Sequence, residues 1–377
     1  MASARVVMER CLRLPRNGMW GGIRVAGMEN NIGKGEEEGE ERLIPAASPL
    51  KPRHKLLTSG VPNQSARVRL GLTEIAALVT LYLVWGSTYL AIRFAITTIP
   101  PFLMAGLRML VAGSLMYVWG RTIGGAPRPT RDEWRETAIV GAFLLLGGNG
   151  FVVWAAQRIP SGVLALLVGA TPVFMVLIGW LIGHDPRPRL LTWLGLLAGF
   201  LGLSVLVGPQ TVVHGQALDL AGSLAAICAT ISWAIGSNYA RSARLPKSRI
   251  LTIAMEMLTG GVMLVMLGVL AGEAPRLHWG AISSQSLIAF AYLVVFGSIV
   301  GFSAYIYLLE KTRPALATSY AFVNPLVAVF LGWALASEQI TARIVVATPL
   351  IVGAVVLISV DRARTKEQVL AEEVEVA

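Results

Sequence analysis

Long apolar runs alternate with short polar connections along most of the chain. Ten of these runs approach the ~20 residues that an α-helix needs to cross a ~30 Å hydrocarbon layer. They cover residues 75–96, 102–119, 138–156, 162–182, 191–207, 220–239, 250–271, 287–309, 315–336 and 344–360. No soluble domain interrupts the series. The pattern therefore predicts an all-α integral membrane protein with ten transmembrane helices.

The composition agrees with this interpretation. Of the 377 residues, 55% are hydrophobic and only 14% are charged, and the mean hydropathy is +0.64, whereas a soluble chain is about a quarter charged. The net charge of +10 is not a sign of a nucleic-acid partner, because that function needs a basic face on a soluble module. We expect a small-molecule substrate and membrane lipids as partners, and a monomer or a homodimer.

The two ends of the chain are polar. Residues 1–69 contain "KGEEEGEER" and "PLKPRHK" and no sustained apolar period, which predicts a disordered cytoplasmic tail. Residues 362–377 form a second, short tail. Cys11 lies in the first tail and Cys228 in an apolar run, so no structural disulfide is expected.

Basic residues are concentrated in alternate connections, and this bias predicts the orientation. With the N-terminus inside, the inner segments hold Lys51, Arg53, Lys55, Arg67, Arg69, Arg121, Arg128, Arg131, Arg135, Arg187, Arg189, Arg241, Arg244, Lys247, Arg249, Lys311, Arg313, Arg362, Arg364 and Lys366. The outer connections hold only Arg158, Arg276 and Arg343. The positive-inside rule then places both termini in the cytoplasm.

An internal repeat relates the two halves of the chain. The segments "QRIPSGVLALLVGATPVFMVLIGWLIGHD" and "EKTRPALATSYAFVNPLVAVFLGWALASE" align without gaps. The alignment matches Gln157 with Glu310, Arg158 with Lys311, Pro172 with Pro325, Gly179 and Trp180 with Gly332 and Trp333, and Asp185 with Glu338. An earlier stretch gives a weaker echo, in which Trp85 matches Trp233 and Arg108 matches Glu256.

The repeats, residues 70–209 and 210–361, contain five spans each. An odd number of spans makes the second copy enter the membrane from the opposite side, so the repeats are inverted. The usual use of such a fold is alternating access, with a substrate site between the halves near the middle of the membrane. The repeat therefore favours transport.

Short motifs in the same order make the chain resemble a known superfamily. They are "LYLVWGSTYLAIRFA", "RML", "GNG", "PSG", "ISWAIGSNYA", "EML", "VFGSIVGFSAYIYL" and "PALATSYAFVNPLVAVFLGW". The chain resembles the drug/metabolite transporter superfamily from about residue 73 to 360, and within it the EamA branch and the YedA-type exporters. The resemblance implies a secondary transporter of the inner membrane with two five-helix EamA repeats. It does not imply a substrate.

Two charged residues fall inside predicted spans. Glu256 lies six residues into its span, roughly 9 Å below the inner boundary, where a carboxylate costs a few kcal/mol unless it faces a cavity or a partner. It is a proton-linked or substrate-binding carboxylate, a structural partner of another charge, or a side chain that snorkels to the interface. Arg108, at the equivalent position of the first half, is the expected partner. Their pair would either staple the halves together or switch between transport states.

Two prolines at mirrored positions interrupt apolar helices. Pro172 and Pro325 remove backbone hydrogen bonds, and the carbonyl groups freed are those of Val168 and Ala321. Bent helices of this kind line a cavity or are packing kinks whose carbonyls bond to Ser and Thr neighbours.

The remaining site candidates are aromatic or amide side chains inside spans. An aromatic and hydroxyl lining suits a partly apolar solute, although large side chains also fill gaps between helices. A buried amide implies a cavity or an interhelical hydrogen bond. The resemblance places Tyr320 in the cavity. The complete set is Trp85, Tyr89, Asn149, Trp233, Asn238, Tyr320 and Asn324.

Three functional classes compete. A secondary transporter that exports a small organic metabolite or drug fits best, with a zwitterionic or neutral aromatic solute and a gradient as its driving force, because no phosphate-binding loop is present. A membrane-embedded enzyme is disfavoured, since no HExxH, paired intramembrane aspartates or GxSxG occur. A non-transporting partner or sensor with the same fold is the third class. No cofactor is expected, and no metal site, because the four histidines lie in the tail or connections.

Overall fold

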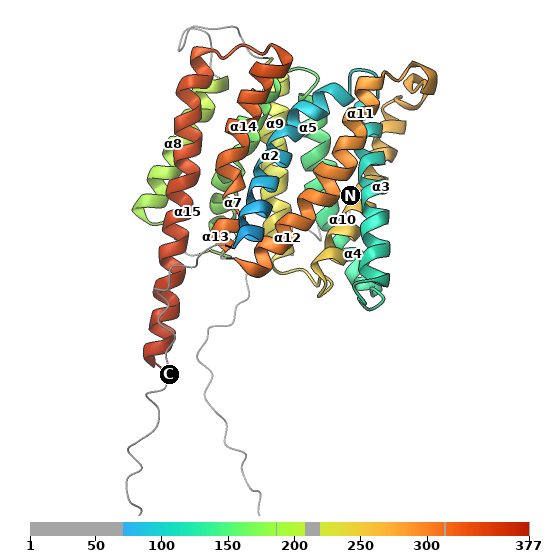
Figure 1. The fold of residues 1–377 in the computed structure, drawn as a ribbon. Helices are drawn as coiled ribbons and strands as arrows, with labels where there is room; N and C mark the ends of the chain where they lie inside the picture. The colour runs from blue at the N-terminus through green and yellow to red at the C-terminus, as the bar shows by residue number, and fades with distance from the viewer. Residues whose placement is uncertain (1–70, 186, 208–218, 313, 377) are drawn as a thin grey trace, which may run out of the picture. The chain divides into compact units, whose positions relative to one another are not determined.

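The observed helices begin and end close to the predicted spans (Figure 1). The computed structural model describes residues 71–185, 187–207, 219–312 and 314–376. The predicted tail at 1–69, with Cys11, lies outside the described residues. Cys228 is a free, exposed cysteine.

The first repeat contains five membrane-crossing segments. In chain order they are α2 (Leu72–Ala95), α3 (Pro101–Thr122), the continuous α4 (Arg131–Gly141), η1 (Ala142–Asn149) and α5 (Gly150–Ala155), the broken pair α6 (Ser161–Gly169) and α7 (Thr171–Leu181), and α8 (Leu190–Val207).

The second repeat has the same order. Its segments are α9 (Leu220–Ala240), α10 (Arg249–Leu270), the continuous α11 (Ser284–Tyr292), η4 (Leu293–Val300) and α12 (Gly301–Lys311), the broken pair α13 (Pro314–Ala317) and α14 (Tyr320–Ala336), and α15 (Ala342–Val376). Two short 3₁₀ turns, η2 (Ala274–Arg276) and η3 (Trp279–Ala281), precede α11.

Within the described residues, nine helical segments are long and apolar enough to cross a membrane, and Tyr320–Ala336 is a shorter apolar helix. Together with α13 it completes the tenth span. The ten predicted spans are thus confirmed. One boundary differs, because the backbone of α15 stays helical to Val376, through the stretch predicted as a short tail.

Polar residues at the predicted connections start several helices. Thr130 and Glu133 form a capping box at the start of α4, and the side chains of Asp219, Ser248 and Ser283 accept hydrogen bonds from the first turns of α9, α10 and α11. These bonds satisfy backbone N–H groups that have no partner inside the helix.

Helix contacts follow the internal repeat. The second helices of the two repeats, α3 and α10, pack along each other, and so do the last helices, α8 and α15. The first helix of each repeat makes mirrored contacts with the other repeat, α2 with α14 and α12 and α9 with α7 and α5, and α6 packs on α14 between them. This exchange of partners is what a pseudo-twofold axis between inverted repeats produces.

Glycines bring α3 and α10 close together. A Cβ atom on Gly106 would lie 2.8 Å from the backbone nitrogen of Val265 and 3.0 Å from the carbonyl oxygen of Gly261. The same antiparallel contact puts Gly113 against Met257. Small residues allow this approach, which is the main source of packing energy between helices in a bilayer.

The third span of each repeat contains an eight-residue π-helical segment, η1 in one and η4 in the other. The hydrophobic pattern of the sequence predicts neither segment. Such turns are rare and are associated with functional sites. Gly148 lies in η1 and Gly301 directly follows η4. A tryptophan of the opposite repeat lies against each of these glycines. Trp233 Cε3 would be 2.8 Å from a Cβ on Gly148, and Trp85 Cδ1 would be 2.8 Å from a Cβ on Gly301.

Candidate functional site between the two repeats

Gly297 of η4 is the meeting point of three helices. Its carbonyl oxygen accepts a hydrogen bond of 3.2 Å from the indole nitrogen of Trp85. The space left by its missing side chain is occupied from two sides, since Arg108 Nη2 and the methyl group of Thr88 would each lie 3.2 Å from a Cβ there. The first and second spans therefore meet the eighth at this glycine.

Trp85 is the centre of an aromatic cluster. Its ring centroid lies 5.1 Å from Phe302, 5.5 Å from Tyr305 and 4.7 Å from Tyr320, and Tyr305 and Tyr320 are 5.8 Å apart. These rings come from both repeats and all are partly exposed. Tyr89 lies one turn further along α2 and is partly buried. Rings with edge-to-face contacts provide an apolar wall with polar tips.

Arg108 is only 6% exposed, and its Nε donates a 3.0 Å hydrogen bond to the hydroxyl group of Ser298. The guanidinium has five N–H donors. Within the described part of the chain, no other hydrogen bond and no salt bridge of its guanidinium is found. A buried cation with open donors is expected to attract an anionic group.

The expected pair between Arg108 and Glu256 is wrong. No salt bridge joins these two residues in the part of the chain that the structure describes. Gly113 lies against Met257 and Gly106 against Val265. The residue of α3 that lies opposite Glu256 is therefore about six positions away from Arg108, which is ~9 Å along the helix axis. The Arg108 side chain turns to η4 instead. The half-buried carboxylate of Glu256 has no hydrogen-bond partner among the described residues.

The two predicted helix-break prolines differ. Pro172 is at the start of α7, directly after the break at Ala170, and the carbonyl of Val168 accepts a 2.6 Å hydrogen bond from Thr171. Pro325 lies inside α14, so the expectation of a break there is wrong. The second repeat is interrupted earlier, between Ala317 and Tyr320.

Pro325 of α14 packs on the end of α6, where the first repeat is interrupted, since its Cγ would lie 2.6 Å from a Cβ on Gly169. Next to it, Asn324 is 7% exposed, and its Oδ1 is buried without a hydrogen-bond partner among the described residues. An unpaired buried amide oxygen is costly.

The remaining predicted residues lie in the mirrored half. Trp233 packs on η1, and its neighbour Ser232 donates a 2.7 Å hydrogen bond to the carbonyl of Phe143. Asn149 is half-buried at the last position of η1. Asn238 is buried, and its amide nitrogen donates to the carbonyls of Met175 and Ala234.

Two ion pairs at opposite ends of the bundle were not predicted. At one end, Arg93 donates to Glu338, which also accepts from the backbone nitrogen and the hydroxyl group of Ser161, each at 2.8 Å, and from the Gly162 nitrogen at 3.1 Å. We call this the Glu338 end. At the other, the Asp185 end, Arg241 bonds to Asp185 at 2.8 Å and to Asn238 at 3.2 Å. The alignment of Asp185 with Glu338 was the signal available in the sequence.

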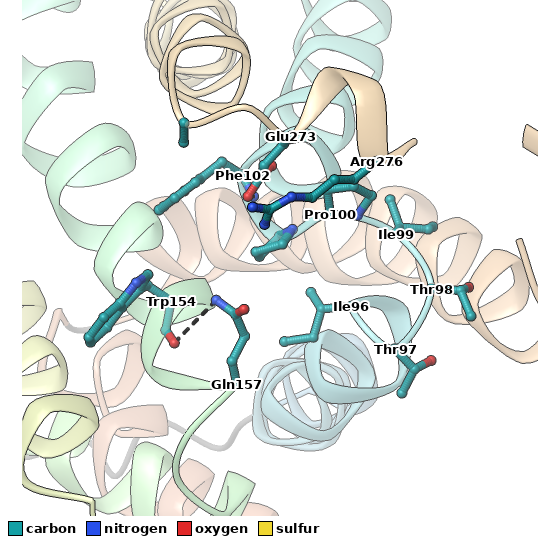
Figure 2. Close-up of a pocket in the computed structure, with 12 residues that line it drawn as sticks. Ile96, Thr97, Thr98, Ile99, Pro100, Phe102, Trp154, Gln157, Glu273 and Arg276 are labelled. Carbon is teal, nitrogen blue, oxygen red and sulfur yellow. Dashed lines mark hydrogen bonds between the residues drawn. The ribbon is translucent and has the colours of Figure 1, made fainter. Parts of the chain in front are cut away.

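A pocket of about 400 Å³ opens at the Glu338 end, between the ends of α2, α5 and α10 and the start of α3 (Figure 2). Glu273 is 4% exposed and accepts hydrogen bonds from the nitrogens of Phe102 (3.2 Å) and Leu103 (2.9 Å), so it caps α3. Arg276 and Gln157 extend into the pocket in Figure 2. Both repeats thus contribute polar groups to it.

The architecture defines a class: a multi-pass membrane protein built from two inverted five-helix repeats. A family model described as the EamA-like transporter family matches twice, over residues 72–208 and 220–360. The chain belongs to the EamA-like transporter family, part of the drug/metabolite transporter superfamily, and has the two predicted repeats. This is a family of transporters, which are not a class of enzymes.

Similar proteins carry matching descriptions. The uncharacterized inner membrane transporter YedA of Escherichia coli K12 is 37% identical over 78% of this chain and 94% of its own length. The uncharacterized transporter YoaV of Bacillus subtilis is 23% identical over 73% of this chain and 92% of its own length. The chain is a multi-pass protein of the plasma membrane, which in bacteria is the inner membrane.

A solved structure has a related fold. It is described as a crystal structure of a protein, is 20% identical, aligns with a TM-score of 0.54, and covers 78% of this chain and 98% of its own.

Proposed function

We propose that the protein is a secondary transporter that exports a small organic metabolite or drug by alternating access. The solute is amino-acid-like or an amphipathic aromatic compound, and its site lies between the repeats, beside Trp85, Arg108 and Tyr320. The export direction and the cytoplasmic placement of both termini come from the resemblance and the basic bias. A tag at the C-terminus, detected from each face of the membrane, tests the orientation.

One observation supports this proposal above the others. A buried guanidinium of the first repeat bonds to Ser298 of the second, directly beside the Trp85 aromatic cluster. An arginine donates two parallel hydrogen bonds to a carboxylate, and aromatic rings bind the apolar part of a solute. Both groups depend on contacts between the repeats, so a relative movement of the repeats changes the site.

Glu256 is the proposed coupling carboxylate. It is not held by Arg108, and a half-buried acid without a described partner is free to exchange a proton. A carboxylate that is protonated at one step of the cycle and ionised at another links solute movement to the proton gradient.

The experiment is solute counterflow in proteoliposomes with a panel of amino acids and amphipathic drugs. Exchange of at least one solute supports a transporter. A folded, lipid-embedded protein that exchanges no solute would favour the alternative, a non-transporting membrane partner or sensor with a transporter-like fold.

A further inference from the structure

The Arg93–Glu338 and Arg241–Asp185 ion pairs occupy equivalent positions in the two repeats. Asp185 and Glu338 match in the ungapped alignment. Arg93 and Arg241 are each eight residues after the matched tryptophans Trp85 and Trp233. The two ion pairs are therefore equivalent contacts, related by the internal repeat.

The surroundings of the two carboxylates repeat as well. The backbone nitrogens of Asp185 and Glu338 each donate a 3.0 Å hydrogen bond to a glycine carbonyl six residues earlier, at Gly179 and Gly332. Because these glycines lack a side chain, each leaves the space that the carboxylate six residues later occupies. A Cβ on Gly332 would be 2.9 Å from Cδ of Glu338, and one on Gly179 would be 3.1 Å from Cγ of Asp185.

Each pair joins the two repeats at a different end of the bundle. Arg93 ends the first span and Glu338 follows the ninth, whereas Arg241 ends the sixth span and Asp185 follows the fourth. An odd number of crossings separates the two ends, so the pairs lie on opposite sides of the membrane. The carboxylates are the less exposed partners, with 8% of the Glu338 side chain and 19% of the Asp185 side chain exposed, against 40% for Arg93 and 47% for Arg241.

We propose that these ion pairs are two latches, one for each side of the membrane, and that each holds the solute site closed toward its own side. This inference rests on the proposed alternating access. Opening at one end must separate the outer parts of the repeats there, and that movement breaks the local pair while the other stays intact. A contact present in one state and absent in the other shifts the balance between the states.

The test measures access to the site from each side. A Thr88→Cys reporter in a Cys11→Ser, Cys228→Ser background is labelled by a membrane-impermeant maleimide in right-side-out and inside-out vesicles. Arg93→Gln removes the charge but leaves Glu338 to cap α6, and it is expected to raise labelling from the Glu338 side relative to the other by about fivefold. Arg241→Gln is expected to shift the same ratio in the opposite direction.

Two sets of variants control for other effects. Arg93→Lys and Arg241→Lys keep the charge and should restore most of the native ratio. Arg158→Gln removes a cation that also lies at the Glu338 end and pairs with Asp219 at 3.7 Å, with both side chains about two-fifths exposed. It should leave the ratio unchanged, since such exposed pairs contribute little.

The outcomes separate the two proposals. If the reporter is labelled from both sides in the native background but Arg93→Gln and Arg241→Gln shift the ratio in the same direction or not at all, the latches are disproved and alternating access stands. If the reporter is labelled from neither side, the proposed central site is wrong and the latch proposal is rejected with it.

Discussion

Arg108 donates its Nε–H to the hydroxyl group of Ser298 and so connects the second span to the eighth. Glu256, the residue at the equivalent position of the other repeat, makes no such bond to any residue that the structure describes. The two intramembrane charges are therefore not paired with each other, and the proposed function gives each a separate role. The positions of the two side chains lead to separate predictions for substrate selectivity and for coupling.

Arg108→Gln is expected to weaken exchange of solutes that carry a carboxylate. Loss of a charge-assisted hydrogen bond costs ~1.5–3 kcal/mol, so KM in counterflow should rise by roughly 10- to 100-fold. Neutral solutes should change little. Ser298→Ala is the control, because it removes the bond between the helices but keeps the guanidinium. Equal effects of both variants on every solute would show that Arg108 is only a structural link.

Glu256→Gln is expected to abolish the dependence of transport on a proton gradient and to retain solute exchange, since an amide cannot release a proton. Counterflow and gradient-driven uptake measured on the same proteoliposomes separate the two activities. A stable variant with unchanged coupling would remove Glu256 from the mechanism. Glu310→Gln, on an exposed residue at the end of α12, is the matched control.

Gly332→Ala and Gly179→Ala are expected to destabilise the protein by ~1–3 kcal/mol, because the added methyl groups overlap with the carboxylates of Glu338 and Asp185. Thermal unfolding in detergent measures the loss. Gly353→Ala on α15 is the control, since a Cβ there would contact nothing within 4 Å. A loss equal to that of the control would mean that the carboxylates move aside at no cost.

Gly106→Ala is expected to be more damaging than Gly120→Ala on the same helix. At Gly106 the new atom would meet the backbone of α10, which cannot rotate away, whereas at Gly120 the nearest atom would be 3.5 Å distant. The first variant should lose a further ~1–3 kcal/mol of stability and the second should unfold close to the native temperature. Equal unfolding temperatures would contradict the close contact of α3 with α10.

The spans were predictable because length and hydropathy are local properties. The inverted repeat was also predictable, since Pro172 with Pro325 and Asp185 with Glu338 keep one offset. The partners of individual side chains could not be predicted in this way. Mirrored depth predicts an Arg108–Glu256 pair, but the Arg108 side chain bonds to Ser298 of η4 instead.

The helix irregularities show the same limit. A π segment such as η1, which Trp233 contacts at Gly148, has wider turns than an α-helix, and nothing in an apolar run marks where such turns occur. Pro325 shows the reverse case, because a proline is a strong local signal for a break but here lies inside α14.

The two mirrored ion pairs give a single chain the kind of contact that a symmetric dimer makes. In a symmetric dimer, residue i of one subunit contacts residue j of the other, and j contacts i. The Arg93–Glu338 and Arg241–Asp185 contacts have this isologous form within a single polypeptide. A five-helix unit that inserts in both orientations needs to evolve only one arginine and one carboxylate to obtain both contacts. Fusion of two copies then allows each contact to be strengthened or weakened alone, and so makes an asymmetric transport cycle possible.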